Sequence, residues 1–316
     1  MINPIKPARL HVGDTVALIS PASRVADKKD VVLSKERLEK LGLNVILGKH
    51  VTASDGYFAG SDAQRADDVN HMFANPDVKA IFTVRGGWGC ARILKYLDFS
   101  VIANNPKIIV GFSDITTLLL AINQKTGLVT FHGPVASLPW PAFTVDYIKK
   151  ILFNAEAAVF CNTKNNPNID LIDTGNNIEA INPGVATGKL IGGNLTVLMS
   201  LIGTPYAPNW EDKILFVEEV NEPIYRIDRM LQQIEQAGVL NKIRGFVFGT
   251  CINCCASHGG FTLTEILKHY FENTHIPSYM GAMIGHQPEI FTLPQGLEVE
   301  LNADNGTIRM LAPSVQ

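Results

Sequence analysis

The first 50 residues follow the order strand, helix, strand, and this order constrains the fold more than any other feature of the chain. Residues 14–20 are an apolar, β-branched run, residues 27–41 carry apolar side chains at helical spacing, and residues 43–47 repeat the strand pattern. Such a unit predicts a parallel sheet with helices on its faces. Ligands of parallel sheets gather at the carboxyl ends of the strands, so functional residues are expected there.

A glycine-rich turn follows the third predicted strand, residues 79–84. The turn, residues 85–89, has the sequence RGGWG. Two adjacent glycines let the backbone approach a ligand closely, so the amides of Gly86 and Gly87 can point at a negatively charged oxygen. The alternatives are an ordinary tight turn or a degenerate dinucleotide loop, although the spacing is not Gly-x-Gly-x-x-Gly.

The fourth predicted strand, residues 108–110, runs into a serine. Ser113 stands between this strand and residues 115–122, which are apolar enough to form a core helix. A serine at such a junction exposes its hydroxyl at the edge of the sheet, beside free helix N–H groups that favour the negative charge of acyl transfer. The alternative is that Ser113 only caps the helix. His132, at the end of the next strand, is expected to bond the backbone rather than to act in the site.

The second half of the chain contributes two acids and a histidine of interest. Residues 214–217 form an apolar run that ends on Glu218 and Glu219, and a buried carboxylate needs a cation or an imidazole near it. Side chains alternate along a strand, so only one of the two acids is expected to face the cleft. His286 lies in a Gly-His-Gln-Pro loop, where it is free to point into a cleft. The alternative is two exposed loop acids and an unremarkable histidine.

A change of composition divides the chain. Residues 161–183 are rich in Asn, are punctuated by Pro and Gly and lack a helical period, which is typical of a linker. The sequence therefore predicts an α/β protein with an N-terminal Rossmann-like parallel-sheet domain over residues 1–160. A smaller C-terminal α/β domain is expected over residues 184–316.

Charge and cysteine content exclude several classes of partner. The chain has 27 Lys and Arg against 30 Asp and Glu, without blocks of like charge, so neither nucleic acid nor a membrane is an expected partner. The N-terminus has no apolar signal core, and a cytoplasmic location is expected by default. Cys251, Cys254 and Cys255 cluster with His258, but a zinc site normally needs a second ligand pair. We expect structural thiols, no metal and no cofactor.

Five segments, in this order and spacing, resemble the LD-carboxypeptidases, also called murein tetrapeptide carboxypeptidases. The segments are residues 85–89, 105–118, 192–206, 214–231 and 285–287, and the resemblance extends from about Val16 to Leu311. It implies a serine peptidase with a catalytic triad of Ser113, Glu218 and His286. It also implies an oxyanion hole built from backbone amides, those of Gly86 or Gly87 and of Asp114.

The resemblance carries further expectations about substrate and assembly. Family members commonly form dimers and remove the terminal D-alanine of a murein tetrapeptide in peptidoglycan recycling, so a small peptide substrate and a homodimer are implied. Arg85 and Trp88 are the implied substrate-binding residues; many members have tyrosine in place of Trp88, which changes one pocket wall. The α/β-hydrolase motif Gly-x-Ser-x-Gly is not met, because Ile115 replaces the second glycine.

Two other functions remain open on the sequence. The family includes microcin C self-immunity peptidases, so hydrolysis of a peptidyl- or aminoacyl-nucleotide is one alternative. A nucleotide-binding module is the other, but the second strand ends on Leu47 and Gly48 without the acidic residue that would bind a ribose. In the leading interpretation Ser113 belongs to the first domain and Glu218 and His286 to the second, which places the site between the domains.

Overall fold

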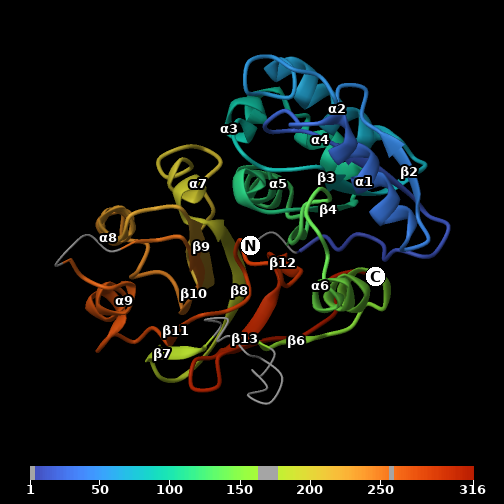
Figure 1. Ribbon diagram of the computed structural model, residues 1–316. Helices are drawn as coiled ribbons and strands as arrows, with labels where there is room; N and C mark the ends of the chain where they lie inside the picture. The colour runs from blue at the N-terminus through green and yellow to red at the C-terminus, as the bar shows by residue number, and fades with distance from the viewer. Residues whose placement is uncertain (1–3, 163–176, 256–259) are drawn as a thin grey trace, which may run out of the picture.

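The computed structural model describes residues 4–162, 177–255 and 260–316. Within these residues the strands form two sheets that lie side by side (Figure 1), with the blue and green first half of the chain next to the yellow to red second half. The predicted α/β fold with an N-terminal, mostly parallel sheet is confirmed, and the C-terminal sheet is mixed.

The first sheet has the strand order β12-β5-β4-β3-β1-β2. Strands β1 to β5 are parallel, and β12 is antiparallel to β5. Its strands are β1 (Thr15–Ile19), β2 (Asn44–Leu47), β3 (Val78–Thr83), β4 (Ile108–Gly111), β5 (Thr130–His132) and β12 (Leu293–Gln295). The helices of this half are α1 (Lys28–Glu39), α2 (Asp62–Ala74), α3 (Cys90–Ile93), α4 (Phe99–Asn104), α5 (Thr116–Thr126) and α6 (Ala142–Ile148).

Helices cover both faces of this sheet, and alternate residues of each strand pack on each side. Ile81 and Ile109 pack with residues of α2 to α5 in one apolar cluster, whereas Phe82 and Val110 pack with residues of α1 and α6 in another. Because successive side chains of a strand point to opposite faces, a strand covered on both sides must be apolar throughout. This explains the unbroken apolar runs that precede the functional turns.

The second sheet has the order β6-β14-β13-β8-β9-β10-β11-β7. Strands β8 to β11 are parallel, and the outer pairs are antiparallel. Its strands are β6 (Val159–Phe160), β7 (Glu179–Asn182), β8 (Val185–Asn194), β9 (Lys213–Val220), β10 (Gly245–Ile252), β11 (Ser278–Met280), β13 (Glu298–Asn302) and β14 (Thr307–Met310). Its helices are α7 (Leu195–Met199), α8 (Ile224–Gln236) and α9 (Leu263–Phe271).

Two strands join the sheet of the other half. β6 pairs with β14 in the second sheet, and β12 pairs with β5 in the first. The sheets therefore cross the predicted domain boundaries at these strands. Within the predicted linker, Glu179–Asn182 form β7, and residues 163–176 lie outside the described residues. In the described part of the chain, no helix has the length and apolar character that crossing a membrane requires.

The expectation of unpaired structural thiols is wrong for two of the clustered cysteines. Cys251 and Cys254 form a disulfide at the end of β10, while Cys255 is free and exposed. The cysteine count ruled out complete pairing, but two residues three apart in a turn can pair locally. His258, the remaining member of the predicted cluster, lies outside the described residues.

Candidate active site

Ser113 occupies a sharp turn between β4 and α5. Its φ angle is +62°, a left-handed conformation that costs energy for a residue with a side chain. The strand that leads into the turn is tightly packed, because a Cβ on Gly111 would lie 2.6 Å from Thr83 Oγ1. The helix-cap alternative is wrong: Ile115 occupies the N-cap position of α5, and no side-chain cap hydrogen bond forms there.

The glycine turn after β3 lies directly against this serine. A Cβ on Gly86 would be 2.9 Å from Ser113 Cβ, 3.2 Å from Ser113 Oγ and 3.2 Å from the Asp114 nitrogen. Any larger residue would therefore displace the serine or its neighbour. Gly87 has a φ of +108°, and a Cβ there would lie 2.5 Å from Ser23 Oγ. The structure thus brings Gly86, Ser113 and the Asp114 amide together.

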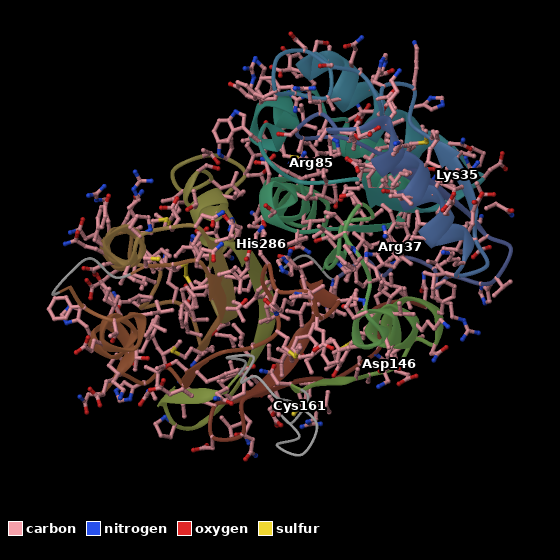
Figure 2. All side chains as sticks on the ribbon, in the orientation of Figure 1. Lys35, Arg37, Arg85, Asp146, Cys161 and His286 are labelled. Carbon is pink, nitrogen blue, oxygen red and sulfur yellow. A yellow bond between two sulfur atoms is a disulfide. The ribbon has the colours of Figure 1, made fainter. Side chains whose placement is uncertain are left out.

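Arg85 and Trp88, the two residues expected to bind substrate, belong to the same glycine turn. The Trp88 amide donates to Ser23 Oγ at 2.9 Å, and the Trp88 side chain is 56% exposed. Arg85 is half-buried, and its guanidinium donates to the Arg24 carbonyl at 3.4 Å. Arg85 therefore lies near the loop that follows β1, on the N-terminal side of the junction between the two halves (Figure 2).

Two buried side chains that the sequence analysis did not assign fasten this turn. The Asp114 carboxylate accepts a hydrogen bond from the Cys90 amide at 2.8 Å, and burial raises the pKa of Asp114. Arg65, 1% exposed, donates to the carbonyls of Gly89 and Pro21, each at 2.8 Å. No local sequence signal marks these roles, because both contacts join segments more than 20 residues apart.

Glu218, which is buried, and His286, which is partly exposed, form a hydrogen-bonded pair. Glu218 Oε2 lies 2.7 Å from His286 Nδ1, and the carboxylate is fully buried. Although burial lowers the pKa of His286, the hydrogen bond and charge of Glu218, together with the charge of Glu219, raise it overall. A proton on Nδ1 held by the carboxylate leaves Nε2 as the basic nitrogen. The pair can therefore act as an oriented base.

Glu219 has a different role. Its carboxylate accepts hydrogen bonds from the Asn194 side chain at 3.0 Å, from the Thr196 amide at 2.8 Å and hydroxyl at 2.7 Å, and from the Val220 amide at 2.9 Å. These donors lie at the start of α7 and at the end of β9. Glu219 thus fixes the local backbone, while its neighbour on β9 contacts the histidine.

The two halves of the site meet across a tight interface. The His286 ring packs on the ring of Phe112, with centroids 4.7 Å apart, and Phe112 directly precedes Ser113. The Thr116 hydroxyl accepts from the Asn194 amide at 3.0 Å, and a Cβ on Gly193 would lie 2.4 Å from that hydroxyl. Figure 2 shows His286 at this junction of the two halves.

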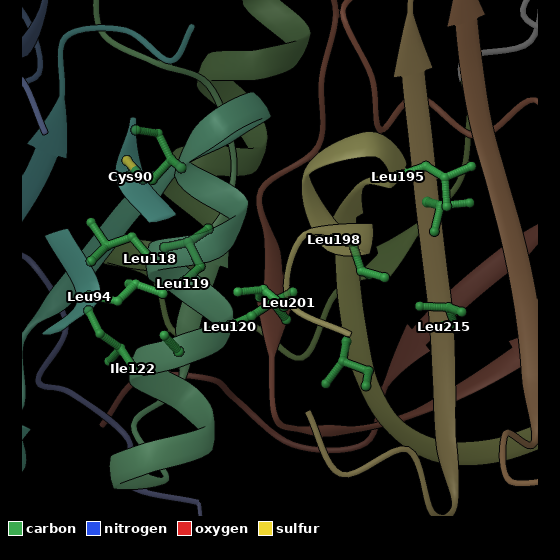
Figure 3. Packing of buried hydrophobic residues seen from close by; sticks show 14 of the residues in the cluster. Cys90, Leu94, Leu118, Leu119, Leu120, Ile122, Leu195, Leu198, Leu201 and Leu215 are labelled. Carbon is green, nitrogen blue, oxygen red and sulfur yellow. The ribbon is translucent and has the colours of Figure 1, made fainter. Parts of the chain in front are cut away.

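Apolar packing between α5 and the segment of α7 supports the junction. Leu118, Leu119 and Leu120 belong to the same buried cluster as Leu198 and Leu201. Figure 3 shows Leu120 and Leu201 facing each other between the two elements. Burying a leucine side chain contributes about 1.5–3 kcal/mol, so this contact holds the two halves at a fixed separation.

Comparisons with known proteins agree with this architecture. The family description "LD-carboxypeptidase N-terminal domain" matches residues 16–133, and "LD-carboxypeptidase C-terminal domain" matches residues 187–301. A probable murein peptide carboxypeptidase from Bacillus subtilis is 37% identical over 96% of this chain and 93% of its own length. The murein tetrapeptide carboxypeptidase of Pseudomonas aeruginosa is 32% identical over 89% of this chain and 91% of its own.

A solved structure shares this fold over nearly the whole length of the chain. It is the microcin C7 self-immunity protein MccF in complex with aspartyl sulfamoyl adenosine, 28% identical, with a TM-score of 0.89 over 99% of this chain and 100% of that chain. The similarity therefore covers both sheets and the junction between them.

Proposed function

This chain belongs to the LD-carboxypeptidase family of serine peptidases, and from this membership we propose that it releases the terminal D-alanine from a murein tetrapeptide. The observation that carries the proposal is the Glu218–His286 pair at 2.7 Å, packed on the residue before a strained serine. A serine hydroxyl is a weak nucleophile until a base takes its proton, and this arrangement supplies an oriented base.

The proposed reaction passes through an acyl-enzyme. Ser113 Oγ attacks the carbonyl carbon before the terminal residue while His286 Nε2 takes the hydroxyl proton. The amides of Gly86 or Gly87 and of Asp114 stabilise the resulting oxyanion. His286 then gives the proton to the leaving amine, and D-alanine departs. Water, deprotonated by His286, attacks the ester and restores the serine, with Glu218 holding the imidazole throughout.

Arg85 and Trp88 are the proposed substrate-binding residues. A carboxypeptidase must recognise a free terminal carboxylate, and a guanidinium matches its geometry with two parallel hydrogen bonds. The exposed Trp88 ring offers an apolar wall beside the glycine turn. Peptidoglycan recycling and a homodimer rest on the family resemblance, a cytoplasmic location rests on the lack of an apolar signal core in the sequence, and all three stay predictions.

A second candidate function is hydrolysis of a peptidyl- or aminoacyl-nucleotide. It is favoured by the TM-score of 0.89 to the microcin self-immunity protein, against 0.80 to a muramoyltetrapeptide carboxypeptidase from Oxalobacter formigenes. The sequence identity of 37% to the Bacillus subtilis carboxypeptidase favours the murein substrate.

Product analysis separates the two substrates. The protein is incubated with synthetic tetrapeptides carrying lysine or diaminopimelate at the third position, and in parallel with an aminoacyl-nucleotide, and the products are identified by mass spectrometry. We expect release of D-alanine from at least one tetrapeptide. Hydrolysis of the nucleotide substrate alone would replace the proposal by the second candidate.

The pH profile of kcat/KM is expected to have an acid limb above pH 6.5, the ordinary histidine value. The contact with Glu218 raises the pKa of His286 above 6.5, and a protonated imidazole cannot accept the serine proton. Activity should therefore be lost as the pH falls through this raised pKa and be present above it. The limb should move to lower pH in Glu218→Gln. A limb below 6.5 in the wild type would contradict the assigned base.

The reaction is expected to be independent of metal. The serine mechanism stabilises the oxyanion with backbone amides and generates its own nucleophile. In the described part of the chain, one group gathers three potential metal ligands, His50, Asp67 and Asp68, and it contains none of the site residues. Turnover should survive prolonged treatment with a chelator. Complete loss of activity that zinc restores would overturn the triad assignment.

A further inference from the structure

His132 contacts all three segments that carry the proposed triad. It lies at the end of β5 and is fully buried. In the parallel pairing of β4 and β5 it stands opposite Gly111, two residues before Ser113. The expectation that it bonds the backbone is met, because His132 Nε2 lies 2.8 Å from the carbonyl oxygen of Ile284. That carbonyl is two residues before His286, in the other half of the molecule.

The His132 ring also contacts two aromatic rings of the site. The His132 ring meets the Phe216 ring edge to face, with centroids 5.1 Å apart, and Phe216 lies two residues before Glu218 on β9. It also meets the edge of Phe112, at 6.1 Å, and Phe112 packs in turn on the His286 ring. One buried side chain thus contacts the strand of the acid, the residue before the nucleophile and the loop of the base.

The hydrogen bond to Ile284 has a defined direction. Burial lowers the pKa of His132 below its ordinary value, even though Glu218 and the Ile284 carbonyl raise it, so the ring is neutral. A carbonyl oxygen only accepts hydrogen bonds, so Nε2 carries the proton and donates. The loop is held from the other side by Gln287, whose side-chain oxygen accepts from the Gly285 amide at 3.1 Å and from the Thr250 hydroxyl.

We propose that His132 is a positioning residue that sets His286 against Ser113 across the junction of the two halves. The inference rests on the proposed serine mechanism, in which Ser113 follows β4 and His286 lies in the loop between β11 and β12. Within the described contacts, the bond from His132 to Ile284 joins β5, the neighbour of the serine strand, directly to the histidine loop. Without this donor the Ile284 carbonyl loses its partner, and the loop can shift relative to the serine.

The test compares two replacements of His132. His132→Gln retains an amide donor at about the position of Nε2, whereas His132→Phe retains a ring and removes the donor. Phe131→Leu is the control, because Phe131 is equally buried on the same strand and alternation places it on the opposite face. Each protein is checked by thermal melting, and the rate of Ser113 labelling by a fluorophosphonate is measured against pH. Labelling requires an activated serine and no peptide substrate.

We expect His132→Phe to lower the labelling rate and kcat on the order of 100-fold, since a misplacement of about 1 Å costs this much, while KM changes little. His132→Gln should stay within about threefold of the wild type, and Phe131→Leu should lower the melting temperature without slowing labelling. The titratable groups that act on His286 are Glu218, which contacts the ring, Glu219, whose charge acts from the other face of β9, and His132. A looser contact with Glu218 should move the acid limb of His132→Phe to lower pH.

The outcomes distinguish this inference from the proposed function. Labelling of Ser113 without hydrolysis of any tetrapeptide would remove the murein substrate and leave the role of His132 standing. A folded His132→Phe that labels at the wild-type rate with an unshifted limb would overturn the positioning role, and so would a His132→Gln that is as slow as His132→Phe. Absence of labelling in the wild type would overturn both.

Discussion

Replacing Ser113 by alanine is expected to abolish turnover on a tetrapeptide while substrate binding persists. The hydroxyl forms the bond to the substrate carbon, so its removal acts on the transition state rather than on the bound ground state. The loss should be on the order of 10⁶-fold, as in other serine peptidases that lack their nucleophile. The substitution removes only the hydroxyl, and it should leave the fold intact because Ser113 caps no helix.

The same reasoning makes the Ser113 and His286 variants non-additive. Residues that act as one unit lose their joint effect when either is removed. The kcat of the Ser113→Ala/His286→Ala double variant should therefore be hardly lower than that of Ser113→Ala alone. Turnover of the three variants is compared, with thermal melts to confirm folding and titration to measure binding. Retained activity in a folded Ser113→Ala protein would refute the serine mechanism.

Glu218→Gln is expected to lower kcat by about 10⁴-fold with the fold preserved. A glutamine at this position can donate to Nδ1 and favour the wrong tautomer, in which Nε2 carries the proton and cannot accept one from the serine. The carboxylate is fully buried and 2.7 Å from the imidazole, so water cannot replace it readily.

Glu219→Gln is the matched control. The Glu219 carboxylate accepts hydrogen bonds from Asn194, Thr196 and Val220. In the variant, one of these donors would face the amide NH₂ of glutamine and lose its acceptor. We therefore expect Glu219→Gln to lower the free energy of unfolding by about 1–3 kcal/mol. Because Glu219 does not contact His286, kcat should change only slightly. A larger effect on kcat from Glu219→Gln than from Glu218→Gln would contradict the assignment of the two acids.

Local sequence patterns predicted the order of strands and helices. A strand that is buried on both faces is a continuous apolar run in the sequence, and the turns between elements contain glycines. The glycine turn, Ser113 and the paired acids were found in the same way, since each directly follows such a run. Strand alternation allowed only one of Glu218 and Glu219 to face the histidine, and Glu218 is the acid that contacts it.

Contacts between distant segments were not predictable from local patterns. The exchange of β6 and β12 between the sheets depends on how the chain packs in space. The backbone bond of His132 was expected, but its partner Ile284 was not, and Arg65 received no role, because each of these buried side chains contacts a distant backbone group that carries no sequence signature.

The central claim is that Ser113 is a nucleophile activated by His286 and Glu218, and fluorophosphonate labelling tests it most directly. The wild-type protein and Glu218→Gln are labelled in parallel, and the modified residue is located by peptide mass mapping. We predict one adduct on Ser113 in the wild type, forming far more slowly in Glu218→Gln. A folded wild-type protein that remains unlabelled, or that carries the adduct on another residue, would contradict the claim.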